Sequence, residues 1–251
     1  MTKDLTNQFF DINKFPAEEG LVVFPISMNR ISNPSQGAQI YYEYLGHFNP
    51  DKIVKSNPNS KAGGVFVYTD FLYLYSEEPA YKLKYRFTDL MISHMKSFQN
   101  ILKKDKHVVQ DSFSYTTWSQ LYLNSNFVSF FDKLKNIYKK DKEFQKYLKE
   151  DFDNLKNTKL SFDEKQIDFF LEEHLMAHLI TKGQVSLYNK FIDGRENWIL
   201  LAYPDKPPKA LTYLYQKDFL KLDNPKNVYQ DSWYDLEEKK LYDHHKINLN
   251  I

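Results

Sequence analysis

Two hydroxyl side chains stand at the ends of apolar runs, where a strand would give way to a loop. Ser27 follows the run GLVVFPI, and Tyr203 ends the run NWILLAY. If the two runs are neighbouring strands of a parallel sheet, both hydroxyls lie at the edge where open α/β sheets bind ligands. A serine there can be a nucleophile if another group assists its proton. The alternatives are a serine that caps a turn and a strand-end tyrosine with a solvated hydroxyl.

A carboxylate and two histidines lie in a third segment, SFDEKQIDFFLEEHLMAHL. Glu173 has apolar neighbours, including Phe169 and Leu175, so it could be partly buried and hold an ammonium group. A solvated helix face is the alternative. His174 and His178 are four residues apart, but HLMAH lacks the glutamate of H-E-x-x-H, and we expect no metal site.

A long amphipathic helix is predicted from residue 77 to 104, with Ser76 before its first turn. Its basic residues gather opposite the apolar face, with Asp89 as the single acid among them; they are Lys82, Arg86, Lys96, Lys103 and Lys104. Such segregation suits a phosphate backbone. The alternative is an ordinary solvent face in a lysine-rich chain.

The bulk composition excludes several classes of protein. The chain has 251 residues, 42% hydrophobic and 27% charged, with a net charge of +1, which is a globular composition. It has no cysteine, so thiol catalysis and disulfides are excluded. No apolar run approaches the roughly 20 residues that span a bilayer, and MTKDLTNQFF lacks a signal-peptide core. We therefore expect a cytoplasmic protein with no membrane partner. The P-loop, G-x-G-x-x-G and G-x-S-x-G motifs are absent.

Apolar strands alternate with long helices along the chain. Strands are predicted at 20–27, 64–75 and 198–203, and helices at 38–48, 77–104, 125–150 and 163–180. One more strand is predicted over ALTYLYQ (210–216), followed by a polar end in which DHH (243–245) is solvated. This alternation predicts an α/β protein, a sheet with helices on both faces, in one domain.

Together these segments resemble the tRNA-dependent cyclodipeptide synthases over most of residues 20–215. VFPISMNRIS (23–32) resembles that family's first strand and nucleophile loop, usually Gly-Ile-Ser-x-x-Asn. GVFVYTDFLYLYSEEPAYKLKYRF resembles its second strand and basic helix. The blocks LYLNSNFVSFFDKLKNIYKKDKEFQKYL and LSFDEKQIDFFLEEHLMAHL resemble its middle helices, and WILLAYPDKPP its late strand and tyrosine.

The resemblance extends to one of the family's two sub-patterns. One has Asn three residues after the nucleophile and Tyr-His at the late strand; the other has a different residue there and Tyr-Pro. This chain has Arg30 and Tyr203-Pro204. A one-residue gap would bring Asn29 to the place of Arg30. Two positions depart from the family: Pro25 replaces a usual Gly, and Phe169 replaces the Tyr of Tyr-x-x-x-Glu, whose Glu is Glu173.

The resemblance implies a single domain, residues 1–251, with a Rossmann-like parallel sheet similar to class I aminoacyl-tRNA synthetase catalytic domains. It implies that two aminoacyl-tRNAs form a 2,5-diketopiperazine by ping-pong acyl transfer, through an aminoacyl and then a dipeptidyl ester on Ser27. No ATP, metal or other cofactor is implied. Tyr203 would move the proton of Ser27, and Glu173 would hold the substrate ammonium.

Further positions take substrate roles in this resemblance. Pro25, Asn29, Arg30, Phe169 and Pro204 would line the aminoacyl pockets. The basic residues of helix 77–104 would hold the acceptor stem of the first tRNA. Three other functions stay open: another aminoacyl-tRNA-dependent transferase, a non-catalytic tRNA-binding Rossmann module and, more remotely, a serine hydrolase.

Overall fold

The computed structural model describes residues 20–45, 62–70, 80–104, 113–123, 125–155, 161–187 and 198–249. Strands and helices alternate along most of this length. The strands are β1 Gly20–Ile26, β2 Ala62–Tyr68, β3 Phe113–Thr117, β4 Trp198–Tyr203, β5 Ser232–Asp235 and β6 Lys240–Asp243. The α-helices are α2 Pro34–Leu45, α3 Ala80–Lys104, α4 Trp118–Leu123, α5 Phe127–Lys140, α6 Lys142–Asp153, α7 Glu164–Thr181 and α8 Lys209–Lys217. Short 3₁₀ turns are η2 Met28–Ile31 and η7 His244–Lys246.

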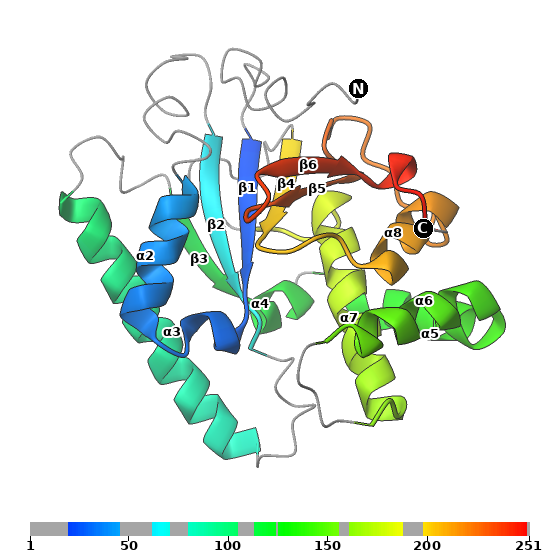
Figure 1. Ribbon diagram of the computed structural model, residues 1–251, viewed down its shortest axis with the longest axis horizontal. Helices are drawn as coiled ribbons and strands as arrows, with labels where there is room; N and C mark the ends of the chain where they lie inside the picture. The colour runs from blue at the N-terminus through cyan, green and yellow to red at the C-terminus, as the bar shows by residue number, and fades with distance from the viewer. Residues whose placement is uncertain are drawn as a thin grey trace.

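The described strands form one sheet in the order β3-β2-β1-β4-β5-β6. All neighbours are parallel except β5 and β6, which form an antiparallel hairpin. The chain moves outward from β1 to β3 and then returns to β4 on the other side of β1 (Figure 1). The strand order therefore reverses between β1 and β4, which is the position where open α/β sheets bind ligands.

Pairing between β1 and β4 covers only the first part of each strand. It runs from Gly20↔Trp198 to Val23↔Leu201, whereas β1 stays paired with β2 as far as Ile26↔Tyr68. Pro25 cannot donate a ladder hydrogen bond. The ends of β1 and β4 are thus free to carry side chains into the space between them.

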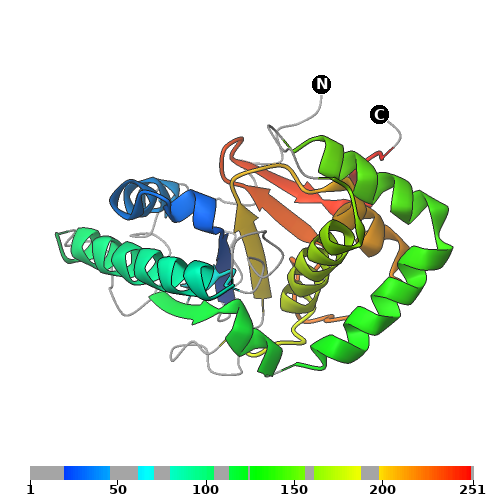
Figure 2. The ribbon, with the colours of Figure 1, turned by 90° about the horizontal axis from the view of Figure 1, so that it is seen from below.

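Both faces of the sheet are covered by helices, as expected (Figure 2). Along β1, Leu21 and Val23 belong to the core formed with α4 to α8. Val22, Phe24 and Ile26 belong to the core formed with α2 and α3. This alternation is the period of a strand that is buried on both sides.

Several sequence-based expectations are confirmed. β1 and β4 are parallel neighbours, and α7 begins after Asp163, whose carboxylate accepts a hydrogen bond from Gln166 N at 3.0 Å. Helix 38–48 corresponds to α2, which begins earlier, at Pro34. The predicted strand 64–75 corresponds to β2, which begins earlier and ends at Tyr68, so the predicted end was wrong. Residues 46–48 and 71–79 lie outside the described residues, and with them the Ser76 helix start.

The expectations for the C-terminal region were wrong. Residues 210–216 belong to a helix, α8. Every side chain from Ala210 to Tyr215 is buried, so the sequence shows no alternation of apolar and polar residues with a helical period. The polar end contains the β5–β6 hairpin, and His244 of DHH is 1% exposed rather than solvated. Strand β3 was also missed.

The predicted helix 125–150 is two helices. Asp141 ends α5 and is the N-cap of α6, where its carboxylate accepts a hydrogen bond from Phe144 N at 2.9 Å. A residue that caps the next helix so well favours a break over continuation.

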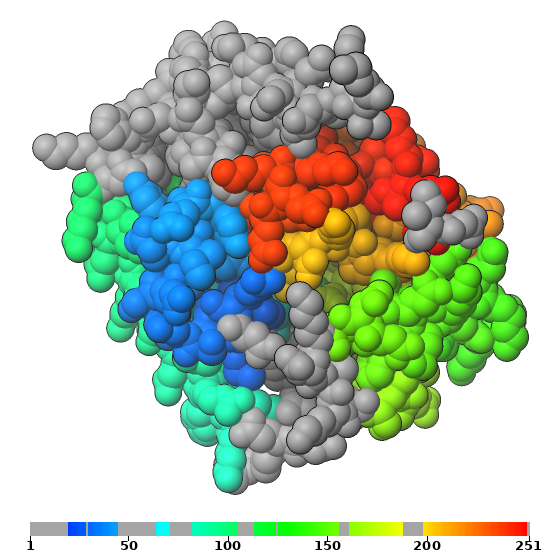
Figure 3. Space-filling view, viewed as in Figure 1, coloured from blue at the N-terminus to red at the C-terminus, as the bar shows by residue number. Residues whose placement is uncertain are grey.

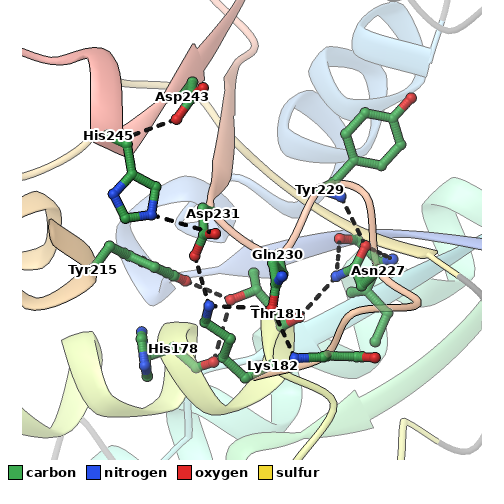
Figure 4. Close-up of polar contacts among 12 residues, drawn as sticks. His178, Thr181, Lys182, Tyr215, Asn227, Tyr229, Gln230, Asp231, Asp243 and His245 are labelled. Atoms are coloured by element: carbon green, nitrogen blue, oxygen red, sulfur yellow. Dashed lines mark hydrogen bonds and ion pairs between the residues drawn. The ribbon is translucent and has the colours of Figure 1, made fainter. Parts of the chain in front are cut away.

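A polar cluster ties the end of α7 to the chain that leads into β5 (Figure 4). We call it the α7-end cluster, and its members are His178, Thr181, Lys182, Tyr215 and Asp231. Lys182 Nζ donates to Asp231 Oδ1 at 2.7 Å. Tyr215 and Thr181 share a hydrogen bond between their hydroxyls. The cluster fixes the position of the C-terminal hairpin against α7.

Candidate active site

Ser27 lies where β1 passes into η2, with φ −81° and ψ 157°. It occupies the N-cap position of η2, but its side chain makes no capping hydrogen bond. Its hydroxyl instead interacts with the side chain of Tyr203 and lowers the pKa of that phenol. The turn-capping interpretation therefore does not account for this serine, and its hydroxyl faces another hydroxyl at the end of β4.

Tyr203 is half-buried at the end of β4 and contacts two groups of the β1 loop. Ser27 and Arg30 both interact with its hydroxyl. Burial and the charge of Glu173 raise the pKa of Tyr203, against the opposing effects of Arg30 and Ser27. The phenol is therefore neutral at physiological pH. It can accept a proton from one partner only while donating its own to another.

Arg30 joins the nucleophile loop to two other segments. Its Nη2 donates to the carbonyl oxygen of Pro204 at 2.8 Å, and its Nη1 lies 3.5 Å from Glu237 Oε1 in the β5–β6 turn. Its guanidinium lies 5.7 Å from the centre of the Tyr203 ring. Figure 3 shows the corresponding surface, where the β1 loop, the β4 exit and the hairpin turn meet on one face.

Glu173 is half-buried on α7. Burial is the main reason that the pKa of Glu173 is raised, with a contribution from Asp151 and an opposing one from His174. Its charge acts on Tyr203, as the pKa of that tyrosine records. A carboxylate with a raised pKa both attracts an ammonium group and accepts a proton more readily. Phe169, one turn earlier, is half-buried and packs edge-on against Phe170, with ring centroids 5.5 Å apart.

The remaining predicted pocket residues lie near this site. Pro25 is half-buried in β1, and its carbonyl oxygen accepts a hydrogen bond from the Tyr41 hydroxyl at 3.3 Å. Pro204 is buried directly after Tyr203. Asn29 lies in η2, but its side chain is outside what the structure describes. Ser27, Arg30, Glu173 and Tyr203 together are called the switch-point site below.

The predicted basic stripe is present on α3. All five basic residues assigned to it are exposed. The apolar residues of the helix pack on the α2 side of the sheet, with Phe87, Phe98 and Leu102 in that core. Over Ala80–Lys104 the helix carries six basic residues and one acid, a net charge of +5.

The described residues hold no group of three or more His, Asp or Glu that could bind a metal ion. His174 and His178 are both buried, with 1% and 0% exposure. Among the helices that the structure describes, none is long and apolar enough to cross a membrane.

Two residues near the site were not predicted from the sequence. Glu237 faces Arg30 from a hairpin turn that had been interpreted as a polar end. Asp151 contacts α7 and α8 from α6. No local pattern distinguishes either residue, because each matters only through contacts with segments far away in the sequence.

The fold and site define an α/β protein with a hydroxyl pair at the switch point of its sheet. Solved structures with this fold include a cyclodipeptide synthase from Bacillus thermoamylovorans, at 15% identity and TM-score 0.52 over 88% of this chain and 89% of that one. A CDPS from Fluoribacter dumoffii has 15% identity and TM-score 0.51 over 81% and 84% of the two chains.

A Mycobacterium tuberculosis protein has 14% identity and TM-score 0.51, over 82% of this chain and 80% of that one. Its description relates cyclodipeptide synthetases to type I tRNA synthetases. At these identities the similarity is one of fold, and the expected fold class is confirmed. No protein-family model and no curated protein matches the sequence.

Proposed function

We propose that the chain is a tRNA-dependent cyclodipeptide synthase formed by one Rossmann-like domain. The observation that carries the proposal is that the side chains of Ser27 and Tyr203 interact at the β1–β4 switch point, where two parallel neighbouring strands end. The fold shared with solved cyclodipeptide synthases supports it. Glu173 and Arg30 supply the charges that an aminoacyl ester substrate needs around that pair.

In the first half-reaction, Ser27 Oγ attacks the ester carbonyl of one aminoacyl-tRNA. The ester bond to the terminal ribose breaks, and the aminoacyl group becomes esterified to Ser27. The proton of Ser27 passes to the departing ribose oxygen through the Tyr203 hydroxyl. Because the phenol is neutral, it accepts one proton and releases its own in the same step. An ester exchange is close to thermoneutral, so the reaction uses no ATP.

In the second half-reaction, Glu173 holds the ammonium of the bound aminoacyl group and accepts its proton. The free amine attacks the ester carbonyl of a second aminoacyl-tRNA. The bond from that carbonyl to the ribose oxygen breaks, the ribose oxygen takes up the proton that the amine loses, and the tRNA departs, which leaves a dipeptidyl ester on Ser27. The new terminal amine then attacks the Ser27 ester carbonyl. An amide bond forms and the bond from the carbonyl carbon to Ser27 Oγ breaks. Oγ takes up the proton that the amine loses, and the 2,5-diketopiperazine departs.

Arg30 and Tyr203-Pro204 support placement in the Tyr-Pro sub-pattern. The Arg30–Pro204 contact of 2.8 Å links the two diagnostic positions directly. We propose that Arg30 orients Tyr203 and borders the second aminoacyl pocket with Pro204 and Asn29. Pro25 and Phe169 would shape the first pocket; Phe169 leaves ammonium binding to Glu173 without help from a tyrosine hydroxyl.

The α3 stripe is proposed to hold the acceptor stem of the first tRNA. Its contacts would be made by the five basic residues named for it, all of which are exposed. Binding of this kind depends on counterion release, so tRNA affinity should fall steeply as salt rises.

Mass spectrometry of culture medium from cells that express the chain tests the proposal. We expect masses of cyclic dipeptides that are absent from a Ser27→Ala culture. A linear amide would favour another aminoacyl-tRNA-dependent transferase. Binding of charged and uncharged tRNA alike, with no product and no effect of Ser27→Ala, would favour the RNA-binding module. Labelling of Ser27 by a fluorophosphonate would favour a hydrolase.

A further inference from the structure

Helix α8 begins directly after the β4 exit, residues 203–208, and does not cap its own N-terminus. Pro208 is the N-cap and makes no side-chain capping bond. The missing acceptor comes from α6. Asp151 Oδ1 accepts a hydrogen bond from Lys209 N at 2.9 Å, and Oδ2 accepts one from Ala210 N at 2.8 Å. Both bonds are charge-assisted, and they determine where the segment that carries Tyr203 joins α8.

The same carboxylate faces α7. His174 Nε2 lies 3.8 Å from Asp151 Oδ2, and the two side chains are only 1% and 10% exposed. Glu173 is the next residue along α7. Asp151 therefore contacts one element that carries Glu173 and a second that continues from Tyr203.

We propose that Asp151 is a positioning residue that holds Glu173 and the β4 exit in their working arrangement. The inference rests on the proposed function of the switch-point site. Small displacements of reacting groups reduce turnover by large factors, so a residue that fixes two of them at once controls the rate without touching substrate.

The negative charge of Asp151 has a second effect, on Glu173. The charged or titratable groups that act on Glu173 are His174 on its own helix, Asp151 on α6 and Tyr203 on β4. Asp151 contributes to the raised pKa of Glu173. Loss of this charge should lower the pKa of Glu173. The acidic limb of the pH–rate profile, where Glu173 becomes protonated, would then move to lower pH.

Two substitutions separate the capping effect from the charge effect. Asp151→Asn removes the charge and one capping bond at almost constant volume. Lys209→Pro removes the backbone N–H that donates to Asp151 and leaves the charge of Asp151 in place. Proline is tolerated at the first helical position, and Pro208 is already extended, at ψ 144°. The matched controls are Asp153→Asn, an exposed acid paired with Lys149 on the same helix, and Lys209→Ala, which keeps the N–H.

The rate of cyclic dipeptide formation is measured from pH 5 to 9, with the aminoacyl-tRNAs that correspond to the product found in culture medium. We expect Asp151→Asn to reduce kcat about 10-fold or more and to move the acidic limb to lower pH. Lys209→Pro should reduce kcat by a similar factor and leave the acidic limb of the pH–rate profile at its wild-type pH. Both should accelerate amide hydrogen exchange over residues 203–213, and both controls should match wild type.

An Asp151→Asn variant with the kcat and acidic limb of Asp153→Asn would overturn the inference. If Asp151→Asn does not fold, a Lys209→Pro variant as active as Lys209→Ala would overturn it equally. Absence of any product from wild type would instead contradict the proposed function. In that case unchanged exchange over 203–213 in both variants would separately contradict the positioning of the β4 exit.

Discussion

Helix α7 contributes to two polar clusters that have similar residue types and differ in how far their side chains are exposed to solvent. Its middle supplies Glu173 to the switch-point site, and its end supplies His178 and Lys182 to the α7-end cluster. Each cluster contains a tyrosine, a cation, a carboxylate and a hydroxyl residue. In the α7-end cluster Thr181 and His178 are 0% exposed and Lys182 7%. In the switch-point site, Ser27, Glu173 and Tyr203 remain half-buried.

The polar groups of the two clusters also serve different purposes. At the α7 end, Asn227 Nδ2 donates to the Thr181 carbonyl at 2.7 Å, and Lys182 Nζ donates to both Asp231 and Gln230 (Figure 4). Ser27, in contrast, occupies a capping position without capping, and its hydroxyl interacts with Tyr203. The exposure of the polar side chains and the hydroxyl of Ser27 that does not cap its turn therefore distinguish the candidate reactive cluster from the structural one. The residue types alone do not distinguish them.

Ser27→Ala should have the largest effect on this contrast. Loss of the acyl acceptor should reduce cyclic dipeptide formation by about 10³-fold or more. The free energy of unfolding should change by less than about 0.5 kcal/mol, because the hydroxyl makes no capping bond. Product yield and urea unfolding measure the two quantities. Ser35→Ala, at an exposed serine bonded to Ser97, is the control and should leave both unchanged.

Lys182→Met should produce the opposite result. It leaves Asp231 without its buried cation, so the free energy of unfolding should fall by about 2–4 kcal/mol. Turnover per folded molecule should stay at the wild-type value. Lys146→Met removes an exposed pair with Glu150 and should cost less than about 1 kcal/mol. A Lys182→Met protein of normal stability, or of low turnover, would break the distinction between the clusters.

Tyr203→Phe keeps the ring and removes the hydroxyl that interacts with Ser27 and Arg30. Proton transfer by a positioned group contributes about 10²–10⁴-fold, and we expect turnover to fall about 100-fold. Rapid-quench kinetics should show that acylation of Ser27 is the slowed step. Tyr242→Phe, at a tyrosine that donates to exposed Glu238, is the matched control. Equal rates for the two variants would remove Tyr203 from the mechanism.

Two buried histidines should make the protein sensitive to acid: His178 of the α7-end cluster and His244, which stacks on Tyr215 of that cluster. Burial lowers the pKa of His178 and of His244 to about 3, whereas an unfolded histidine titrates near 6.5. The unfolded chain therefore binds more protons below about pH 6.5, and the free energy of unfolding falls as pH drops toward 3. Each histidine contributes up to about 1.4 kcal/mol per pH unit. Urea unfolding at pH 7, 6 and 5 should show a shallower dependence for His178→Leu; an unchanged slope would contradict this explanation.

The sequence was sufficient where local pattern and tertiary role agree. Apolar runs predicted β1 and β4 as strands, and the condition that would bring Ser27 near Tyr203, that these strands are parallel neighbours, is met. Sequence patterns did not predict α8, where burial on all sides hides the helical period. They did not predict β5 and β6 either, because these strands have four residues each and are stabilised by the rest of the fold. Asp151 and Glu237 could not be found, because only the folded chain brings them to α7, α8 and Arg30.

Intact-protein mass spectrometry after brief mixing with aminoacyl-tRNA tests the covalent role of Ser27 most directly. We expect a mass increase of one aminoacyl group, located on the peptide that contains Ser27 and absent from Ser27→Ala. An adduct that persists in Ser27→Ala, or product that forms without any adduct on Ser27, would contradict it.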